Sequence, residues 1–226
     1  MPRKKYKTFR PHPYLGAMSV VLASGSPQRS EILRKLGVEF EVVVPGVEEL
    51  TGGDPEVEVL ENARMKARAV GGRVLSRQEG SSSSQAAGED PLATPPARDA
   101  ALVIACDTDV VLDGRTLGKP DDEKEARDYL DRMSGRPHTV LSGLVVLEGG
   151  EERSGLERTT VIFKELDEAA KERYVRFGEW RGRSGGYAIQ TLGSTLVARL
   201  EGSVSNVVGL PVGLLAELAP RLFECN

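Results

Sequence analysis

Apolar and polar positions alternate along the chain in a way that predicts strands and helices in turn. Residues 19–23 form a short apolar run that predicts a strand. Ser26 and Pro27 follow it as a helix N-cap and a first-turn proline, and Gly37 stands where that helix should end. Residues 38–44 then alternate as a half-buried strand does.

A second helix is predicted to begin at Asp54-Pro55. Its apolar residues recur near the helical period and are expected to face the core; they are Val57, Leu60, Ala63, Ala67 and Val70. Residues 76–99 are rich in Ser, Gly, Pro and Ala and have no apolar period. Because ordered patterns resume beyond them, these residues predict a disordered loop inserted into one domain.

The second half of the chain continues the alternation. Residues 101–106 are wholly apolar and predict a central strand that ends at Asp107. Asp113-Gly114 predicts a hairpin. The later elements are a helix over 121–133, paired strands over 138–148 and 157–166, a helix near 167–177, two short strands around Glu201-Gly202 and a helix after Pro211. The expected class is α/β with a mixed sheet.

Composition restricts the class of protein. The chain has 226 residues, of which 39% are hydrophobic, so it can bury a proper core in a single domain, here residues 18–226. Cys106 and Cys225 lack the spacing of a disulfide framework or a zinc module, which favours a reducing cytoplasm. The net charge of -4 gives no global attraction for a nucleic acid polymer. No apolar run approaches the roughly 20 residues of a membrane span, so no membrane association is expected.

Residues 1–17 differ from the rest of the chain. They carry basic side chains at Arg3, Lys4, Lys5, Lys7 and Arg10 and have no hydrophobic period. This composition predicts a flexible basic tail. We expect the tail to be dispensable, with translation able to begin at Met18.

The first candidate for chemistry is the turn at residues 22–29. A strand that ends in small hydroxyl-bearing residues and then opens a helix presents free N–H groups and the positive end of a helix dipole, which suit a phosphate. Ser24 lies in this turn, and Arg29 in the first helical turn can add a bidentate contact. Plain helix capping explains the same residue types, and the segment alone does not distinguish the two.

Two acidic residues and one lysine are further candidates. An acidic residue at the end of a strand, such as Asp107, can hold a divalent metal or accept a proton from water. Lys119 can reach a phosphate, while Asp122 can cap the next helix or join the outer shell of a metal site. Capping or turn formation is the alternative for both acids. Lys66 and Glu49 are, by themselves, ordinary surface charges.

These segments occur together and in one order, and the chain thereby resembles the Maf family of nucleoside triphosphate pyrophosphatases, also named for septum formation inhibition. The matching blocks run from about Ser19 to Pro211 and are LASGSPQRSEIL, VPGVEE, ENARMKA, ACDTDVVLDGRTLGKPDD, MSGRPHTV, GYAIQTLG and NVVGLP. They cover nearly the whole chain outside the tail and the Ser-rich loop.

The resemblance implies an elongated mixed sheet with flanking helices and a deep central cleft, of the Maf/Ham1 type shared with inosine triphosphate pyrophosphatases, and often a homodimer. It also implies that a nucleoside triphosphate binds with Mg²⁺ or Mn²⁺ and is cut to the monophosphate and pyrophosphate. By position, Asp107 matches the catalytic carboxylate, and Glu49 with Asp107 matches the metal site. The substrate-binding positions correspond to Ser24, Arg29, Lys66, Lys119 and Asp122, the last being an acidic position associated with the metal and the attacking water.

Three positions bear on the nucleobase. The subgroup of the family that handles dTTP and UTP has Thr after the catalytic Asp and Gln in the GYxIQ block, here Thr108 and Gln190, whose groups suit the edge of thymine or uracil. Gln28 stands where that subgroup usually has Arg, which removes a charge and a stacking plane. We expect dTTP and UTP as substrates. The alternatives are 7-methyl-GTP or another modified nucleotide, or a nucleotide-binding regulator of septum formation with little turnover.

Asp109 is a second departure, since an apolar residue commonly follows the Asp-Thr pair in the family. The sequence leaves two roles open for it, which are a metal contact and a solvated surface charge.

Overall fold

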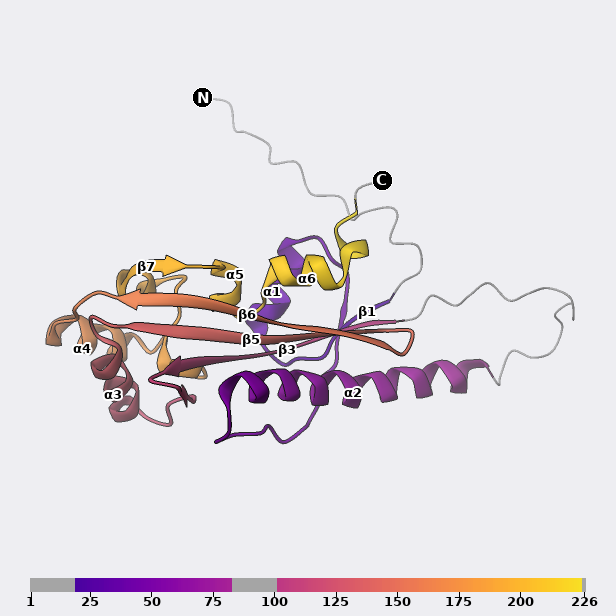
Figure 1. Cartoon of the computed structure of the whole chain (residues 1–226), viewed down its shortest axis with the longest axis horizontal. Helices are drawn as coiled ribbons and strands as arrows, with labels where there is room; N and C mark the ends of the chain where they lie inside the picture. The colour runs from indigo at the N-terminus through magenta and orange to yellow at the C-terminus, as the bar shows by residue number, and fades with distance from the viewer. Residues whose placement is uncertain (1–18, 83–100, 225–226) are drawn as a thin grey trace, which may run out of the picture.

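The computed structural model describes residues 19–82 and 101–224 of an elongated molecule (Figure 1). The predicted tail, residues 1–17, lies outside the described residues, as does most of the predicted loop over 76–99. Residues 76–82 of that loop are helical, because helix α2 (Pro55–Ser82) continues through them. The chain has no proline before Pro91 to end that helix, so the lack of an apolar period does not stop it.

One mixed sheet forms the frame of the described structure. Its strand order is β2-β1-β3-β5-β6-β7, and β4 also pairs with β3. The strands are β1 (Val20–Leu22), β2 (Glu41–Val42), β3 (Leu102–Leu112), β4 (Arg115–Leu117), β5 (Pro137–Glu148), β6 (Glu151–Phe163) and β7 (Val197–Glu201). β1 is parallel to both β2 and β3, whereas the other pairings are antiparallel. The expected α/β class with a mixed sheet is confirmed.

Two short strands share one edge of β3. Strand β5 pairs with β3 along almost its whole length and therefore occupies the opposite edge. On the shared edge, β1 pairs with residues 102–104 and β4 pairs with residues 110–112. No described strand pairs with residues 105–109 on that edge, which leaves the middle of β3 open on one side.

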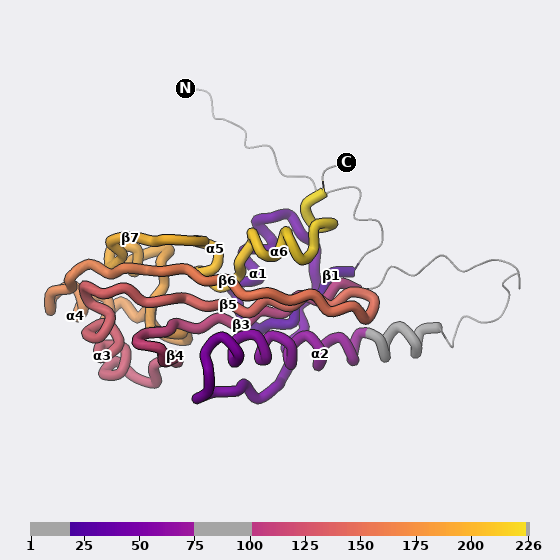
Figure 2. Tube along the Cα trace, viewed as in Figure 1, coloured from indigo at the N-terminus to yellow at the C-terminus, as the bar shows by residue number. Residues whose placement is uncertain are grey.

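Helices cover both faces of the sheet (Figures 1 and 2). They are α1 (Pro27–Lys35), α2, α3 (Glu123–Met133), α4 (Glu168–Phe177), α5 (Val204–Val208) and α6 (Val212–Leu218). Helix α2 lies along one face, α1 and α6 lie over the other, and α3 and α4 lie at the far end of the long strands. None of the helices in the described residues is long and apolar enough to cross a membrane.

The buried apolar residues form separate clusters that define two lobes. In the first lobe, one cluster lies under α2 around Ala67, and another lies under α1 and α6 around Leu33. The second lobe contains the cluster between α3, α4 and the distal ends of the strands, with Met133 and Tyr174 at its centre. The long strands pass through both lobes and hold them together.

Close contact between α2 and β5 depends on a glycine. A Cβ atom on Gly143 would lie 2.3 Å from the carbonyl oxygen of Val59. Ala63 and Ala67 are fully buried, as predicted, but Val57 is 58% exposed and Val59 is buried instead. The sheet-facing stripe therefore runs through residues 59, 63, 67 and 70, and the prediction for Val57 is wrong.

Several strand predictions are wrong in extent. Within residues 38–44 only Glu41 and Val42 pair, and β3 continues past Asp107 to Leu112. Only one of the two strands expected around residues 201–202 forms, because Ser203 caps α5 immediately afterwards. The Asp113-Gly114 hairpin is confirmed, with both residues at positive φ.

The close packing at Gly143 gives a stability prediction. Gly143→Ala is expected to lower the free energy of unfolding by about 1–3 kcal/mol, because the new methyl group collides with the backbone of α2. Gly213→Ala in α6 is the matched control, since a Cβ there meets nothing within 4 Å, and it should be neutral or stabilise by up to about 1 kcal/mol. Urea unfolding measures both variants. Equal free energies of unfolding for Gly143→Ala and the wild type would show that Gly143 is not in close contact with the backbone of α2.

Candidate active site

A cavity of about 490 Å³ opens beside the unpaired middle of β3, between the two lobes. Its volume lies in the range typical of small-molecule sites. Nine of the ten site residues expected from the sequence line it: Ser24, Gln28, Arg29, Glu49, Lys66, Asp107, Thr108, Lys119 and Gln190. The fold thus gathers residues from separate segments around one space.

The turn between β1 and α1 forms one wall and holds Arg29 in place. Ser26 is the N-cap and Pro27 the first residue of α1, as predicted, although the Ser26 side chain makes no capping hydrogen bond. Arg29 donates from Nε to the carbonyl oxygen of Gly209 (2.8 Å), from Nη1 to Ser24 Oγ (3.0 Å) and from Nη2 to Thr108 Oγ1 (3.2 Å). All three acceptors are neutral, so the guanidinium charge stays available for an anion.

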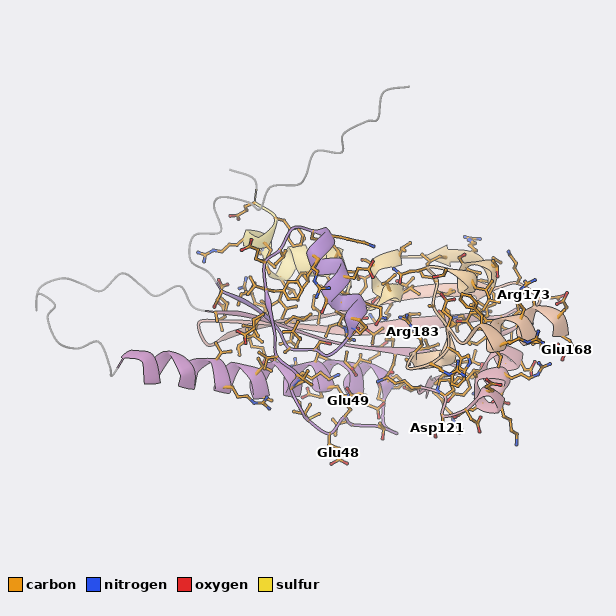
Figure 3. The ribbon with its side chains drawn as sticks, turned by 180° about the vertical axis from the view of Figure 1, so that it is seen from behind. Glu48, Glu49, Asp121, Glu168, Arg173 and Arg183 are labelled. Carbon is orange, nitrogen blue, oxygen red and sulfur yellow. The ribbon has the colours of Figure 1, made fainter. Side chains whose placement is uncertain are left out.

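A buried lysine links two carboxylates on the floor of the cavity. Lys66 Nζ lies 2.6 Å from Asp107 Oδ1 and 2.5 Å from Glu49 Oε1. Lys66 is 5% exposed and Asp107 is 7% exposed, whereas the Glu49 side chain is 43% exposed. Figure 3 shows Glu49 on the loop beside α2, while the neighbouring Glu48 points away from the molecule. The two residues that looked like ordinary surface charges are therefore joined to Asp107.

Asn62 is a site residue that the sequence analysis missed. Its amide nitrogen donates to Asp107 Oδ2 (3.1 Å) and to the Leu50 carbonyl (3.1 Å), and its oxygen accepts from the Leu50 N–H (2.7 Å). It is 2% exposed. Asn62 therefore fixes the second oxygen of Asp107 and the loop that carries Glu49. The signal was present in the sequence, because Asn62 precedes Lys66 by four residues and so shares its helix face.

Strand β3 contributes two more residues at the cavity. Thr108 Oγ1 lies 2.8 Å from Ser142 Oγ and accepts from Arg29, so its hydroxyl is engaged by protein groups. Asp109 is half-buried, and Ser184 Oγ donates to it at 2.9 Å. Burial, and then the nearby charge of Asp107, raise the pKa of Asp109 to about 6. Asp109 thus lines the cavity on the same face of the strand as Asp107.

The second lobe supplies the opposite wall. Lys119 follows β4, and Gln190 belongs to the segment between α4 and β7; both line the cavity and are exposed. Tyr187, in the same segment as Gln190, is buried with its hydroxyl 2.8 Å from His138 Nε2. This buried contact fixes the start of the segment that presents Gln190.

Asp122 is the one expected site residue that the structure does not bring to the cavity. Its side chain accepts from the Glu125 N–H at 2.8 Å and caps α3. It is exposed and lies outside the cavity lining. Because Pro120 and Asp121 turn the chain away from Lys119 toward α3, the capping alternative describes Asp122.

The expected metal site has ligands of suitable chemistry. Asp107 and Glu49 present carboxylate oxygens at one place, and Mg²⁺ is commonly bound by one or two carboxylates together with substrate phosphates and water. In residues 19–82 and 101–224, no three or more His, Cys, Asp or Glu side chains lie close enough together to coordinate a metal ion by themselves. The donor set therefore fits an ion that shares its coordination with a phosphate.

The raised pKa of Asp109 leads to a prediction about stability and pH. Because the pKa of Asp109 is raised from 3.8 to about 6 in the fold, its charged form destabilises the fold; this effect grows as the pH rises from about 4 to about 6 and is complete above that. The free energy of unfolding of Asp109→Asn should exceed that of the wild type by less than about 1 kcal/mol at pH 4 and by up to about 3 kcal/mol at pH 8.

Urea unfolding at the two pH values measures this difference. Asp121→Asn, which changes an exposed carboxylate outside the cavity, should leave stability unchanged at both. A difference between Asp109→Asn and the wild type that is the same at pH 4 and pH 8 would refute the buried, disfavoured charge.

Comparison with known proteins places the chain in a family. Residues 19–222 match the family model described as Maf-like protein. The dTTP/UTP pyrophosphatase of Deinococcus radiodurans is 42% identical over 89% of this chain and 92% of its own, and that of Pelotomaculum thermopropionicum is 39% identical over 89% and 95%. The solved structure of the Staphylococcus aureus Ham1 protein aligns with 64% of this chain and 71% of its own, at 14% identity and a TM-score of 0.38. The family model and the identities show that this chain belongs to the Maf family.

Proposed function

We propose that this protein hydrolyses dTTP and UTP to the monophosphate and pyrophosphate in the cavity between its lobes. The observation that carries the proposal is the convergence of three cations, Arg29, Lys66 and Lys119, on the space beside Asp107. The names of the Deinococcus and Pelotomaculum relatives support the same two substrates.

The cations suit a triphosphate. Among the described residues, neither Arg29 nor Lys119 forms an ion pair with a carboxylate, so both charges are free for phosphate oxygens. The N-terminus of α1 adds unpaired backbone N–H groups at the same wall. Because charge on the phosphoryl oxygens increases in the transition state, fixed positive groups lower the barrier more than they stabilise the bound substrate.

Asp107 is the carboxylate suited to activate water. It receives a water proton as the water oxygen bonds to the α-phosphorus and the bond from that phosphorus to the bridging oxygen breaks. Pyrophosphate then leaves with the bonding electron pair. Lys66 and Asn62 hold the two Asp107 oxygens at fixed positions, so the base does not have to be oriented during the reaction.

A divalent cation, Mg²⁺ or Mn²⁺, is part of the proposal. Asp107 and Glu49 are the residues that would hold it. Such an ion supplies positive charge to phosphoryl oxygens and lowers the pKa of water bound to it.

Selection of the pyrimidine base is assigned to Gln190 and the residues near it. The Gln190 amide has no protein partner among the described residues and can offer both a donor and an acceptor to a uracil or thymine edge. Thr108 contributes indirectly to base selection, because its hydroxyl accepts a hydrogen bond from Arg29 and so helps to hold that side chain in place. A cytoplasmic location, expected from the cysteine content, and a homodimer, implied by the resemblance to the family, both stay predictions.

Pyrophosphate release tests the proposal directly. With Mg²⁺ or Mn²⁺ present, dTTP and UTP should be hydrolysed faster than CTP and 7-methyl-GTP. Asp107→Asn should reduce kcat by about 10²- to 10⁴-fold, since it keeps the shape and removes the base. Asp121→Asn is the matched control, with an exposed carboxylate outside the cavity, and should keep wild-type kcat.

Other results of the same assay would point elsewhere. Preference for 7-methyl-GTP would replace the pyrimidine assignment with the purine alternative. Binding of nucleotide without any product would favour the regulator. Full activity of Asp107→Asn would remove Asp107 as the base.

Asn62 gives a separate prediction. Asn62→Ala should lower kcat by about 10- to 100-fold with a smaller change in KM, because it frees Asp107 and the Leu50 loop without removing a charge. Asn62→Asp keeps the acceptor for the Leu50 N–H but places a second carboxylate beside Asp107, so its kcat should fall at least as far as that of Asn62→Ala. Wild-type kcat in Asn62→Ala, at unchanged thermal stability, would show that Asn62 does not position Asp107.

A further inference from the structure

Arg183 is a cation of the second lobe that has no role in the proposed function. It lies in the segment between α4 and the 3-10 turn Ser184–Gly186 and lines the same cavity as the start of α1. Figure 3 shows it at the junction of the two lobes. The guanidinium therefore reaches the cavity from the wall opposite Arg29.

The backbone around Arg183 is firmly attached to its lobe. The Gly185 N–H donates to the Gly118 carbonyl (2.9 Å), and Ser184 Oγ lies 2.8 Å from the Leu117 carbonyl. Gly185 has a φ of 68°, and a Cβ there would lie 2.6 Å from a methyl group of Val110. These contacts tie the segment to β3 and β4 and fix the point from which the Arg183 side chain extends.

Gln28 of the first lobe is the partner of Arg183. When the Gln28 amide is oriented so that its nitrogen donates to Ser26 Oγ (3.0 Å), its oxygen accepts from both terminal nitrogens of Arg183, at 2.9 and 3.0 Å. The opposite orientation would face amide hydrogens with guanidinium hydrogens. The two side chains thus form a forked hydrogen bond across the cavity.

The charges at this contact are not balanced by protein groups. Arg183 forms no ion pair with a carboxylate among the described residues. Its neighbours across the cavity are the N-terminal end of α1 and Arg29, both positive. A neutral amide oxygen is a weaker acceptor for a guanidinium than a phosphate oxygen. The place between Arg183 and α1 is therefore electrostatically suited to an anion.

We propose that Arg183 is a substrate-binding residue, which exchanges the Gln28 oxygen for oxygens of the nucleotide's phosphate chain and so clamps it against α1. This inference rests on the proposed function for the identity of the anion, a nucleoside triphosphate. Gln28 keeps the guanidinium over the cavity before binding. A neutral partner serves this purpose because it can be displaced without separating an ion pair.

Steady-state kinetics with dTTP tests the role of Arg183. Arg183→Ala should raise KM by about tenfold to a hundredfold, since a charged hydrogen-bonding group is lost. Arg183→Gln keeps most of the side-chain length without the charge and should show a similar rise. Arg181→Ala is the matched control, because Arg181 stacks on Trp180 and pairs with Glu123 outside the cavity.

Binding of inorganic pyrophosphate, measured by calorimetry, provides a readout that does not need turnover. Its affinity should fall by a similar factor in Arg183→Ala and stay at the wild-type value in Arg181→Ala. Gln28→Ala should weaken binding by about twofold to tenfold, through loss of preorganisation. The effect of Gln28→Ala should vanish in the Arg183→Ala background, because the contact requires both residues.

The outcomes separate this inference from the proposed function. If the wild type hydrolyses dTTP and Arg183→Ala behaves like Arg181→Ala in both assays, the role of Arg183 is refuted and the activity stands. If the wild type hydrolyses neither dTTP nor UTP, the proposed function fails, and pyrophosphate calorimetry still decides whether Arg183 binds a phosphate anion. Additive effects of Gln28→Ala and Arg183→Ala would refute the link between them.

Discussion

Lys66 carries a charge that the protein buries almost completely, and the arrangement of the cavity follows from how that charge is compensated. Burying an unpaired ammonium group would strongly destabilise the fold, and removing one partner of a buried ion pair typically lowers the free energy of unfolding by about 3–5 kcal/mol. Asp107 and Glu49 provide the compensation, from β3 and from the loop before α2. Because Lys66 is carried by α2 and Asp107 by β3, the packing of α2 on the sheet brings this cation and this carboxylate together at the cavity.

The sheet explains why the cavity opens beside Asp107. A strand buried in the middle of a sheet normally has partners on both edges, and an acidic residue there would have no route to a substrate. Here β1 and β4 divide one edge of β3 between them and leave residues 105–109 uncovered. The short parallel strand β1 also ends at this gap, so the N-terminus of α1 points into it. Asp107 and Asp109 thus line the cavity beside this interruption, together with the start of α1.

Local signals in the sequence predicted elements well where one residue pair determines the backbone. Asp113-Gly114 and Ser26-Pro27 are examples, because positive φ or a fixed proline φ leaves few alternatives. The same reasoning ended β3 at Asp107, since a run of polar residues looks like the end of a buried strand. It failed there because polar residues that face a cavity remain part of the strand. Asn62 and Arg183 were missed for a related reason. Their roles depend on partners 45 and 155 positions away, which no local pattern contains.

The two sides of the cavity also differ in charge. The carboxylates of Asp107 and Glu49 contact Lys66. Within residues 19–82 and 101–224, Arg29 and Arg183 donate only to neutral oxygens, at the start of α1 and beside it. A polyanion would be repelled by the acidic group unless a cation is shared there, and it would be attracted by the two guanidinium groups. Under the proposed function, the leaving pyrophosphate therefore lies on the side of α1 and Arg183, and the phosphorus that water attacks lies on the side of Asp107. The groups proposed to bind the phosphate chain then come from both lobes, while the group proposed to activate water, Asp107, comes from strand β3, which passes through both.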